Sequence, residues 1–169
     1  MNDLKLLKEL KAWARQRFEL GSHSVHGADH WKRVELLGVA IGSKEGADLL
    51  VVQAFAWIHD VARESDGPDP DHGLRSAEIV LNEEFPFSLL REDRRQTLAK
   101  ACAGHSKGML SKDPTIATCW DADRLGLIRC GISVRVDRLS TRTARTPKLL
   151  RLAESLLRGP KRRSRRRRA

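Results

Sequence analysis

The stretch WIHDVAR (Trp57–Arg63) decides the fold, because a histidine and an aspartate stand side by side at the end of an apolar helical pattern. Val52 and Ala56 precede His59 at helical spacing, so His59 continues their inward stripe. Burying an ionisable group is costly unless it is paired or bound to a metal. Other polar residues on apolar helical stripes are therefore candidates for the same site.

Three further segments carry such a residue, namely His30, His105 and Asp123. Each continues an apolar stripe at spacings of three or four residues, as an amphipathic helix requires. Alone, each would more often be a hydrogen-bonded core residue than a ligand. Together with His59 and the adjacent Asp60 they predict a metal centre to which four helices contribute.

Mixed imidazole and carboxylate ligands are typical of a divalent transition metal ion, which here means Mn²⁺, Fe²⁺, Co²⁺, Ni²⁺ or Zn²⁺. A closed structural zinc site is less well matched, because such sites favour thiolates. The three cysteines, Cys102, Cys119 and Cys130, form no CxxC pair. We expect all three to be reduced, small core residues.

Helical periodicity runs through the chain and predicts an all-α fold. The first helix follows Leu4, Leu7, Ala14 and Phe18 and ends near Gly21. Further helices are expected at about residues 29–41 (with Gly42 near the end), 44–62, 73–84, 91–103, 114–127 and 147–157. Turn formers make 65–73 a loop, and 132–136 alternates like a strand but has no partner strand, so we expect an extended loop.

The net charge of +10 is concentrated at one end of the chain. Seven positive charges stand in the last nine residues, KRRSRRRRA, which contain no acid, so +3 remains for residues 1–160. We predict one compact helical domain over residues 1–158 and a disordered Arg/Lys-rich tail over 159–169. The tail would make at most a weak, salt-sensitive contact with nucleic acid or acidic proteins. A solubilising or incidental tail explains it equally well.

No apolar run approaches the roughly 20 residues of a membrane helix. The N-terminus MNDLKLLKELKAW lacks the apolar segment of a signal peptide. These features predict a cytoplasmic protein that does not bind membranes. The oligomeric state is left open by the sequence.

The residues His30 in HWKRV, His59-Asp60 in WIHDVAR and Asp123 in DADRL resemble the H…HD…D pattern of the HD superfamily of metal-dependent phosphohydrolases. The likeness covers about residues 26–127. It implies an all-helical domain in which these four residues hold a divalent metal. After His59-Asp60 the chain has Val61-Ala62-Arg63 instead of the IGK of many relatives, and the HD-GYP signature is absent.

Two further segments, HGLRSAEIV (72–80) and ACAGHSKG (101–108), resemble those of bacterial HD proteins that hydrolyse diadenosine tetraphosphate. Small HD proteins of unassigned activity share the HG..H..RV pattern at residues 26–34 as well. The resemblance implies that His72 and His105 hold a second metal ion, with Asp60 as the bridge between one ion and the other. One or two ions are therefore expected.

The resemblance implies hydrolysis of a phosphate ester or anhydride by metal-activated water, with a nucleotide as the substrate. The candidate catalytic residues are Asp60, His72, His105 and Arg63, and the candidate substrate-binding residues are Arg63, Arg75 and Arg33. The leaving-group acid is open among His72, His105 and Glu64. Asp121 is expected to orient a neighbour or cap a helix, and His26 to precede the helix that carries His30. No Walker loop, nucleophile elbow or G-x-G-x-x-G motif occurs.

Two alternatives remain at this stage. The first is a non-catalytic HD module that binds a metal or nucleotide and signals through a partner. The complete set of ligand positions argues against it. The second is an HD phosphodiesterase that acts on nucleic acid and is anchored by the basic tail.

Overall fold

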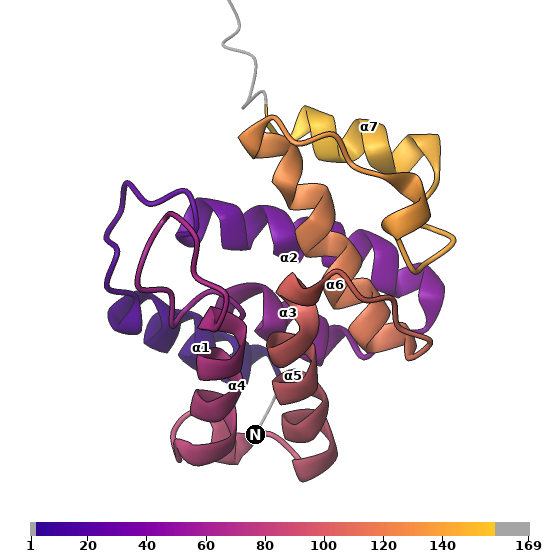
Figure 1. Cartoon of the computed structure of the whole chain (residues 1–169). Coiled ribbons are helices and arrows are strands. Elements are labelled where there is room, and N and C mark those ends of the chain that lie inside the picture. Colours follow the sequence, from indigo (N-terminus) through magenta and orange to yellow (C-terminus); the bar gives the residue numbers. More distant parts are fainter. Residues whose placement is uncertain (1–2, 158–169) are drawn as a thin grey trace, which may run out of the picture.

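The computed structural model describes residues 3–157, and this part of the chain is helical without a β-strand, as the periodicity predicts (Figure 1). The α-helices are α1 (Asp3–Arg17), α2 (Ala28–Glu45), α3 (Leu49–Ile58), α4 (His72–Asn82), α5 (Glu92–Gly104), α6 (Pro114–Gly126) and α7 (Pro147–Ser155). Short 3₁₀ helices lie between them, among them η1 (Phe87–Leu89), η2 (His105–Lys107), η3 (Leu127–Cys130) and η4 (Val136–Arg138). The predicted tail, 159–169, lies outside the described residues.

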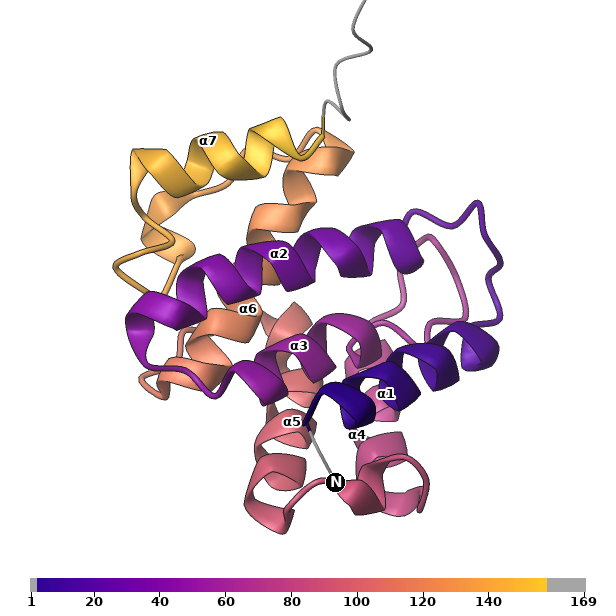
Figure 2. The same ribbon diagram turned by 180° about the vertical axis from the view of Figure 1, so that it is seen from behind.

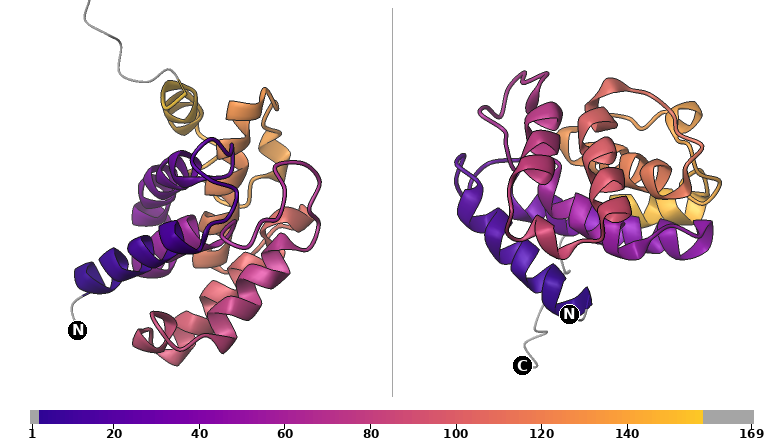
Figure 3. Two further views of the ribbon diagram at one scale, coloured as in Figure 1. Left: turned by 90° about the vertical axis from the view of Figure 1, so that its left-hand side faces the viewer. Right: turned by 90° about the horizontal axis from the view of Figure 1, so that it is seen from below.

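The central helix is α3, which packs against α1, α2, α5 and α6. Its sequence, LLVVQAFAWI, is apolar on every side, and such a helix must be surrounded by others. Helices α4 and α5 form a hairpin below it in Figure 1, and α2 crosses α6 on the other side. Figure 2, from behind, shows α7 lying over α2, and Figure 3 shows α4 and α5 side by side from below.

The predicted helix over residues 44–62 is wrong at both ends. Helix α2 continues through Gly42 to Glu45 and is terminated by Gly46, whose φ of 72° lies in the left-handed region that favours glycine. Asp48 then starts α3, because its side chain accepts hydrogen bonds from the backbone N–H groups of Leu50 and Val51. These two local signals outweigh the helical periodicity that runs across them.

The C-terminal end of α3 matters more for function. The helix ends at Ile58, so His59 and Asp60 lie in the turn that follows it and not within a longer helix. The backbone still curves in helical fashion, since Val61 N–H donates to Ile58 O and Arg63 N–H donates to Asp60 O. The turn leaves Asp60 close to several helix ends at once.

The predicted inward stripe of α1 is confirmed in part, since Leu7 and Ala14 are buried and Phe18 packs against the core, but Leu4 is not part of it. Leu6, Leu7, Leu10 and Ala14 are buried, whereas Leu4 is exposed. The buried stripe is set by the contact with α3, which the periodicity of α1 alone does not specify. Helix α1 also ends at Arg17, short of the predicted end near Gly21, and α2 runs four residues past its predicted end at 41. The predicted helices that correspond to α4, α5, α6 and α7 agree with the structure to within two residues at their ends.

Two smaller predictions have different outcomes. Residues 132–135 are irregular and lead into η4, so the predicted extended loop is confirmed. Cys102 and Cys119 are buried and unpaired, but Cys130 is unpaired and exposed, which corrects its assignment to the core. Cys130 ends η3, a 3₁₀ helix without a buried residue. Within residues 3–157, no helix is long and apolar enough to cross a membrane.

The packing of α2 generates a stability prediction. Leu37 is 1% exposed and belongs to the core, whereas its neighbour Leu36 is 56% exposed. Leu37→Ala should lower the free energy of unfolding by about 2–5 kcal/mol, because it removes buried methyl groups and leaves a cavity. The matched control Leu36→Ala should change it by less than about 0.5 kcal/mol. Urea denaturation followed by circular dichroism measures both, and equal effects would contradict the packing described here.

Candidate metal centre

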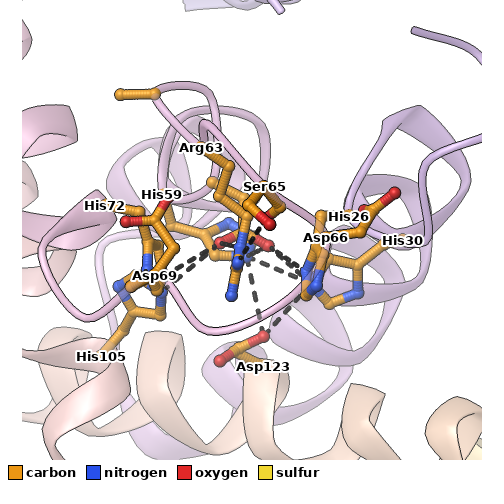
Figure 4. Close-up of polar contacts among 12 residues, drawn as sticks. His26, His30, His59, Arg63, Ser65, Asp66, Asp69, His72, His105 and Asp123 are labelled. Carbon is orange, nitrogen blue, oxygen red and sulfur yellow. Dashed lines mark hydrogen bonds and ion pairs between the residues drawn. The ribbon is translucent and has the colours of Figure 1, made fainter. Parts of the chain in front are cut away.

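Six polar side chains from five parts of the chain meet below the end of α3. They are buried, and they are His30, His59, Asp60, His72, His105 and Asp123. His30 lies in the first turn of α2, His72 begins α4, His105 follows α5, and Asp123 lies near the end of α6. Figure 4 shows His72 and His105 on one side, His30 on the other and Asp123 beneath. The structure thus brings together every residue that the sequence proposed as a ligand.

The carboxylate of Asp60 lies at the centre of this cluster. Its Oδ2 atom is 3.3 Å from His59 Nε2 and 3.6 Å from His30 Nε2. Its Oδ1 atom is 3.2 Å from His72 Nε2 and 3.7 Å from His105 Nε2. Each oxygen therefore faces its own pair of imidazoles, which is the geometry of a bridging carboxylate.

The first group of candidate ligands contains His30, His59 and Asp60, whose ligand atoms lie within 4.8 Å of one another. The Nε2 atoms of His30 and His59 are 3.1 Å apart. Asp123 completes this group, because its Oδ1 atom is 3.2 Å from His30 Nε2 and 3.6 Å from His59 Nε2.

The second group contains Asp60, His72 and His105. The Nε2 atoms of the two histidines are 2.8 Å apart. This approach requires a glycine at position 73, where a Cβ atom would stand 2.6 Å from Cys102 O and 3.1 Å from the His105 ring. The glycine after His72 therefore lets α4 come close enough to α5 for the histidines to meet.

Three of the imidazoles are oriented by the backbone. His59 Nδ1 donates to Phe55 O at 3.1 Å, His105 Nδ1 donates to Cys102 O at 2.7 Å, and His72 Nδ1 donates to Asp69 O. Because a carbonyl only accepts, the proton of each neutral ring is on Nδ1 and the lone pair of Nε2 points into the cluster.

This arrangement fits a divalent metal ion. Two Nε2 lone pairs that face each other at 2.8 Å repel unless a proton or a cation lies between or beside them. Histidine ligands of metals are commonly held in this way, with the second ring nitrogen donating to a carbonyl or carboxylate. The donor set of imidazoles and carboxylates suits Mn²⁺, Fe²⁺, Co²⁺, Ni²⁺ or Zn²⁺.

Comparisons with known proteins agree with this geometry. No family model matches the chain. A Bacillus subtilis protein, "Uncharacterized protein YpgQ", is 31% identical over 133 residues, which cover 76% of this chain and 63% of that protein. A crystal structure of a predicted HD superfamily hydrolase from an uncultured Thermotogales bacterium superposes with a TM-score of 0.68 at 25% identity and covers 93% of both chains.

The chain has the HD-domain fold and is similar to an HD superfamily hydrolase. The helical arrangement over nearly the whole described chain and the clustered histidines and aspartates both support this assignment. The sequence resemblance on His30, His59-Asp60 and Asp123 is therefore confirmed at the level of the superfamily and the fold. The HD domain described here also has a cluster that can hold a metal.

Electrostatics in the HD domain favour ligands that are ready to bind a metal. Burial lowers the pKa of His30 to about 4, although Asp123 opposes the shift. Burial would raise the pKa of Asp60, but the charge of His59 and the hydrogen bond of His105 outweigh it and hold this pKa well below its usual range. A neutral imidazole and ionised carboxylates are the forms that ligate metals.

His59 differs from His30 because two carboxylates lie close to it. Burial would lower its pKa, but the negative charges of Asp60 and Asp123 outweigh burial and raise the pKa. A proton on His59 thus takes a position that a metal cation can fill, with the same carboxylates balancing either charge. Protons and metal ions should therefore compete at this histidine.

A cavity of about 270 Å³ opens onto the cluster. Asp60, His72, His105, Asp123 and Arg63 line it, so a ligand in the cavity reaches both candidate metal groups. Arg63 also donates from Nε to Asp60 Oδ1 at 3.3 Å and from Nη1 to Ser65 O at 3.0 Å.

The other two arginines proposed for substrate binding do not line this cavity. Arg75 donates to Ala62 O and to the carboxylate of Asp69, and so holds the loop before α4 in place. Arg33 lies on α2, where its charge acts on Asp29. Neither arginine lines the metal cavity, and the guanidinium of Arg75 is already paired with Asp69.

Several residues of the cavity were not expected there from the sequence. His26 precedes α2, as expected, but its Nδ1 atom is 3.2 Å from Asp60 Oδ2. Arg129 Nη2 is 3.3 Å from the same His26 nitrogen, and Arg124 and Ser106 also line the cavity. The spacing of His26, four residues before His30, was a sequence signal that His26 belongs to the site. Nothing in the sequence connects Arg129 with His26, which stands about a hundred positions earlier.

Asp121 is not a candidate ligand, in agreement with the sequence interpretation. Its carboxylate accepts hydrogen bonds from the backbone N–H of Ser140 and from the N–H and hydroxyl of Thr141. It therefore orients the segment between η4 and α7, while Asp123, two residues later, faces the histidines.

The two oxygens of Asp60 generate a prediction about metal content. Wild-type protein loaded with Mn²⁺ should bind two ions per chain, and His72→Ala should retain one, because it removes a ligand from the second group only. Asp60→Ala should weaken both sites by more than about tenfold, since even residues that only support a ligand are worth 10–100-fold in affinity.

The control is His23→Ala, which removes an exposed histidine. Elemental analysis after dialysis gives the metal content, and the rise in melting temperature with added metal gives an independent readout. The bridging geometry would be contradicted if His72→Ala lost both ions or if Asp60→Ala retained both.

Proposed function

We propose that this HD domain is a metal-dependent phosphohydrolase that cleaves a phosphate ester or anhydride of a nucleotide-type substrate with activated water. The observation that carries the proposal is the position of Asp60, which faces two imidazole pairs at the base of an open cavity. The cations of Arg63, Arg124 and Arg129 beside that cavity supply the charge that a phosphate requires.

A divalent ion held by His30, His59, Asp60 and Asp123 would supply a Lewis acid that makes a water molecule acidic near neutral pH. Burial of the ligands keeps bulk water away from the reacting groups and strengthens every charge interaction there. Asp60 orients the attacking water through its carboxylate, and Arg63, 3.3 Å from Asp60 Oδ1, holds that carboxylate in place. Arg124 and Arg129 are positioned to balance charge on the phosphate oxygens.

The candidates for the leaving-group acid differ in their positions. Glu64 has a side chain that is 75% exposed and paired with Arg75 at 3.4 Å, and it does not line the metal cavity. His72 and His105 line the cavity with their Nε2 atoms directed inward. A histidine that holds the second ion through Nε2 has no proton there to donate, so we propose His72 or His105 as the acid only for a protein that holds one ion.

A nucleotide is the substrate class that the motif resemblance favours, and the arginines around the cavity suit its phosphates. The similar crystal structure is described only as a predicted HD superfamily hydrolase, so its description supports hydrolysis and no particular substrate. The non-catalytic alternative is less well supported, because all six candidate ligands are present and meet. We place the reaction in the cytoplasm.

Activity is tested by phosphate release from a panel of nucleotides with Mn²⁺-loaded protein. Wild type should release phosphate or pyrophosphate from at least one compound, and Asp60→Ala should lower kcat by about 10²–10³-fold or more, the loss seen when a charge-stabilising group is removed. The matched control is Asp29→Ala, whose carboxylate is exposed on the first turn of α2. Stoichiometric metal binding without release from any phosphate compound would contradict the proposal.

The basic tail requires a separate experiment, since it lies outside the described residues. We propose that it is an accessory that contacts nucleic acid weakly and does not contribute to hydrolysis. Deletion of residues 160–169 should leave nucleotide hydrolysis unchanged and weaken binding to RNA and DNA, measured by fluorescence anisotropy at two salt concentrations. A fall in nucleotide hydrolysis after the deletion would favour the nucleic-acid-directed alternative.

A further inference from the structure

A second cavity, of about 260 Å³, lies next to the metal centre, between η3 and the loop that leads to η4. It shares Gly108, Arg124 and Leu127 with the cavity onto which Asp60 and Asp123 open. A molecule whose phosphate lies at the metal centre therefore reaches the second cavity with whatever is attached to that phosphate.

The lining of the second cavity differs from that of the first. Leu127, Ile132 and Val134 contribute apolar surface, and no carboxylate lines it. Ile132 is 50% exposed, so half of its apolar side chain is available to a ligand in the cavity. The volume lies near the lower end of the range for small-molecule pockets, so the cavity suits one ring-sized group.

Three arginines surround this apolar surface, and they are not equivalent. Arg135 is paired with Asp137 through contacts of 3.1 and 2.5 Å. Arg124 donates to the carbonyl oxygens of Arg138 and Met109. The guanidinium of Arg138, in contrast, forms no hydrogen bond or ion pair with the part of the chain between residues 3 and 157. Its donors are available to a ligand.

The walls of the cavity are held in place from α6. Arg124 Nη1 donates to Arg138 O at 3.1 Å, and Asp121 accepts from the backbone of Ser140 and Thr141. Both residues flank Asp123, which faces the metal centre from the same helix. The distance between the metal centre and the second cavity is therefore fixed by one rigid element, and a preformed site of this kind costs little ordering when it binds.

We propose that the second cavity binds the planar heterocyclic group of the substrate, with the ring against Leu127, Ile132 and Val134 and with Arg138 donating to acceptors at the edge of the ring. This inference rests on the proposed function, since it assumes that phosphate binds at the metal centre. It makes Ile132 and Arg138 residues that determine specificity. A polyphosphate or a sugar phosphate has no group that matches the apolar surface.

The test is a binding measurement with Mn²⁺-loaded protein and two kinds of ligand, the four common nucleoside 5′-monophosphates and ribose 5-phosphate, which lacks only the base. By titration calorimetry, at least one nucleotide should bind about tenfold or more tightly than ribose 5-phosphate, the equivalent of one well-placed contact. Ile132→Asp should remove this preference, because it places a carboxylate in the apolar lining, and should leave ribose 5-phosphate binding within about threefold of wild type.

Val136→Asp is the matched control. Val136 belongs to the same segment and is 42% exposed, but it does not line the second cavity. It should retain the wild-type preference. Arg138→Gln, a substitution at an exposed position, should reduce the preference about threefold or more even if Ile132→Asp fails to fold, which circular dichroism would reveal.

The possible outcomes separate the two proposals. Equal affinity for every nucleotide and ribose 5-phosphate, or a preference that survives both Ile132→Asp and Arg138→Gln, overturns the subsite. If the preference exists and is lost in the variants but no phosphate compound is hydrolysed, the subsite stands and the proposed hydrolase activity fails. Hydrolysis without any preference for a base supports the proposed hydrolase activity and contradicts the proposed base-binding subsite.

Discussion

A carboxylate buried among five imidazoles is the feature on which the rest of the structure depends. Asp60 is 3% exposed, and an isolated charge in that position would be expelled or neutralised. It remains ionised because imidazoles approach both of its oxygens and Arg63 donates to one of them. The elements that carry the histidines therefore bring each imidazole to within 3.7 Å of this carboxylate, and α6 adds Asp123 beside His30 and His59.

The fold meets this requirement through helix ends more than through helix interiors. His59 and Asp60 follow α3, His72 starts α4, His105 follows α5, and His30 lies in the first turn of α2. At such positions a side chain can reach a neighbouring element without disturbing the packed apolar faces behind it. The close approach of α4 and α5 at Gly73 is the clearest packing requirement, because a larger residue there would separate His72 from His105.

Helix α6 connects the candidate metal centre to the second cavity. Within four residues it directs Asp123 toward the histidines, Asp121 toward the backbone of residues 140–141, and Arg124 toward two loop carbonyls. Three charged residues thus perform three different tasks because successive residues on a helix differ by about 100° in direction. Arg124 lines the second cavity and also holds the backbone of Arg138, another residue of its lining.

The sequence by itself predicted the helical class, most helix positions and five of the candidate ligands, and the resemblance to HD proteins added His72. Periodicity reports which face of a helix is buried, and an ionisable residue on such a face requires a partner. It did not determine where α2 ends and α3 begins, because the left-handed Gly46 and the capping Asp48 interrupt a pattern that continues on both sides. Only the tertiary structure placed His26, Arg129 and the second cavity at the site and directed Arg75 and Arg33 elsewhere. Those positions depend on contacts between residues far apart in the chain, such as His26 with Arg129, and no local pattern encodes the packing that creates them.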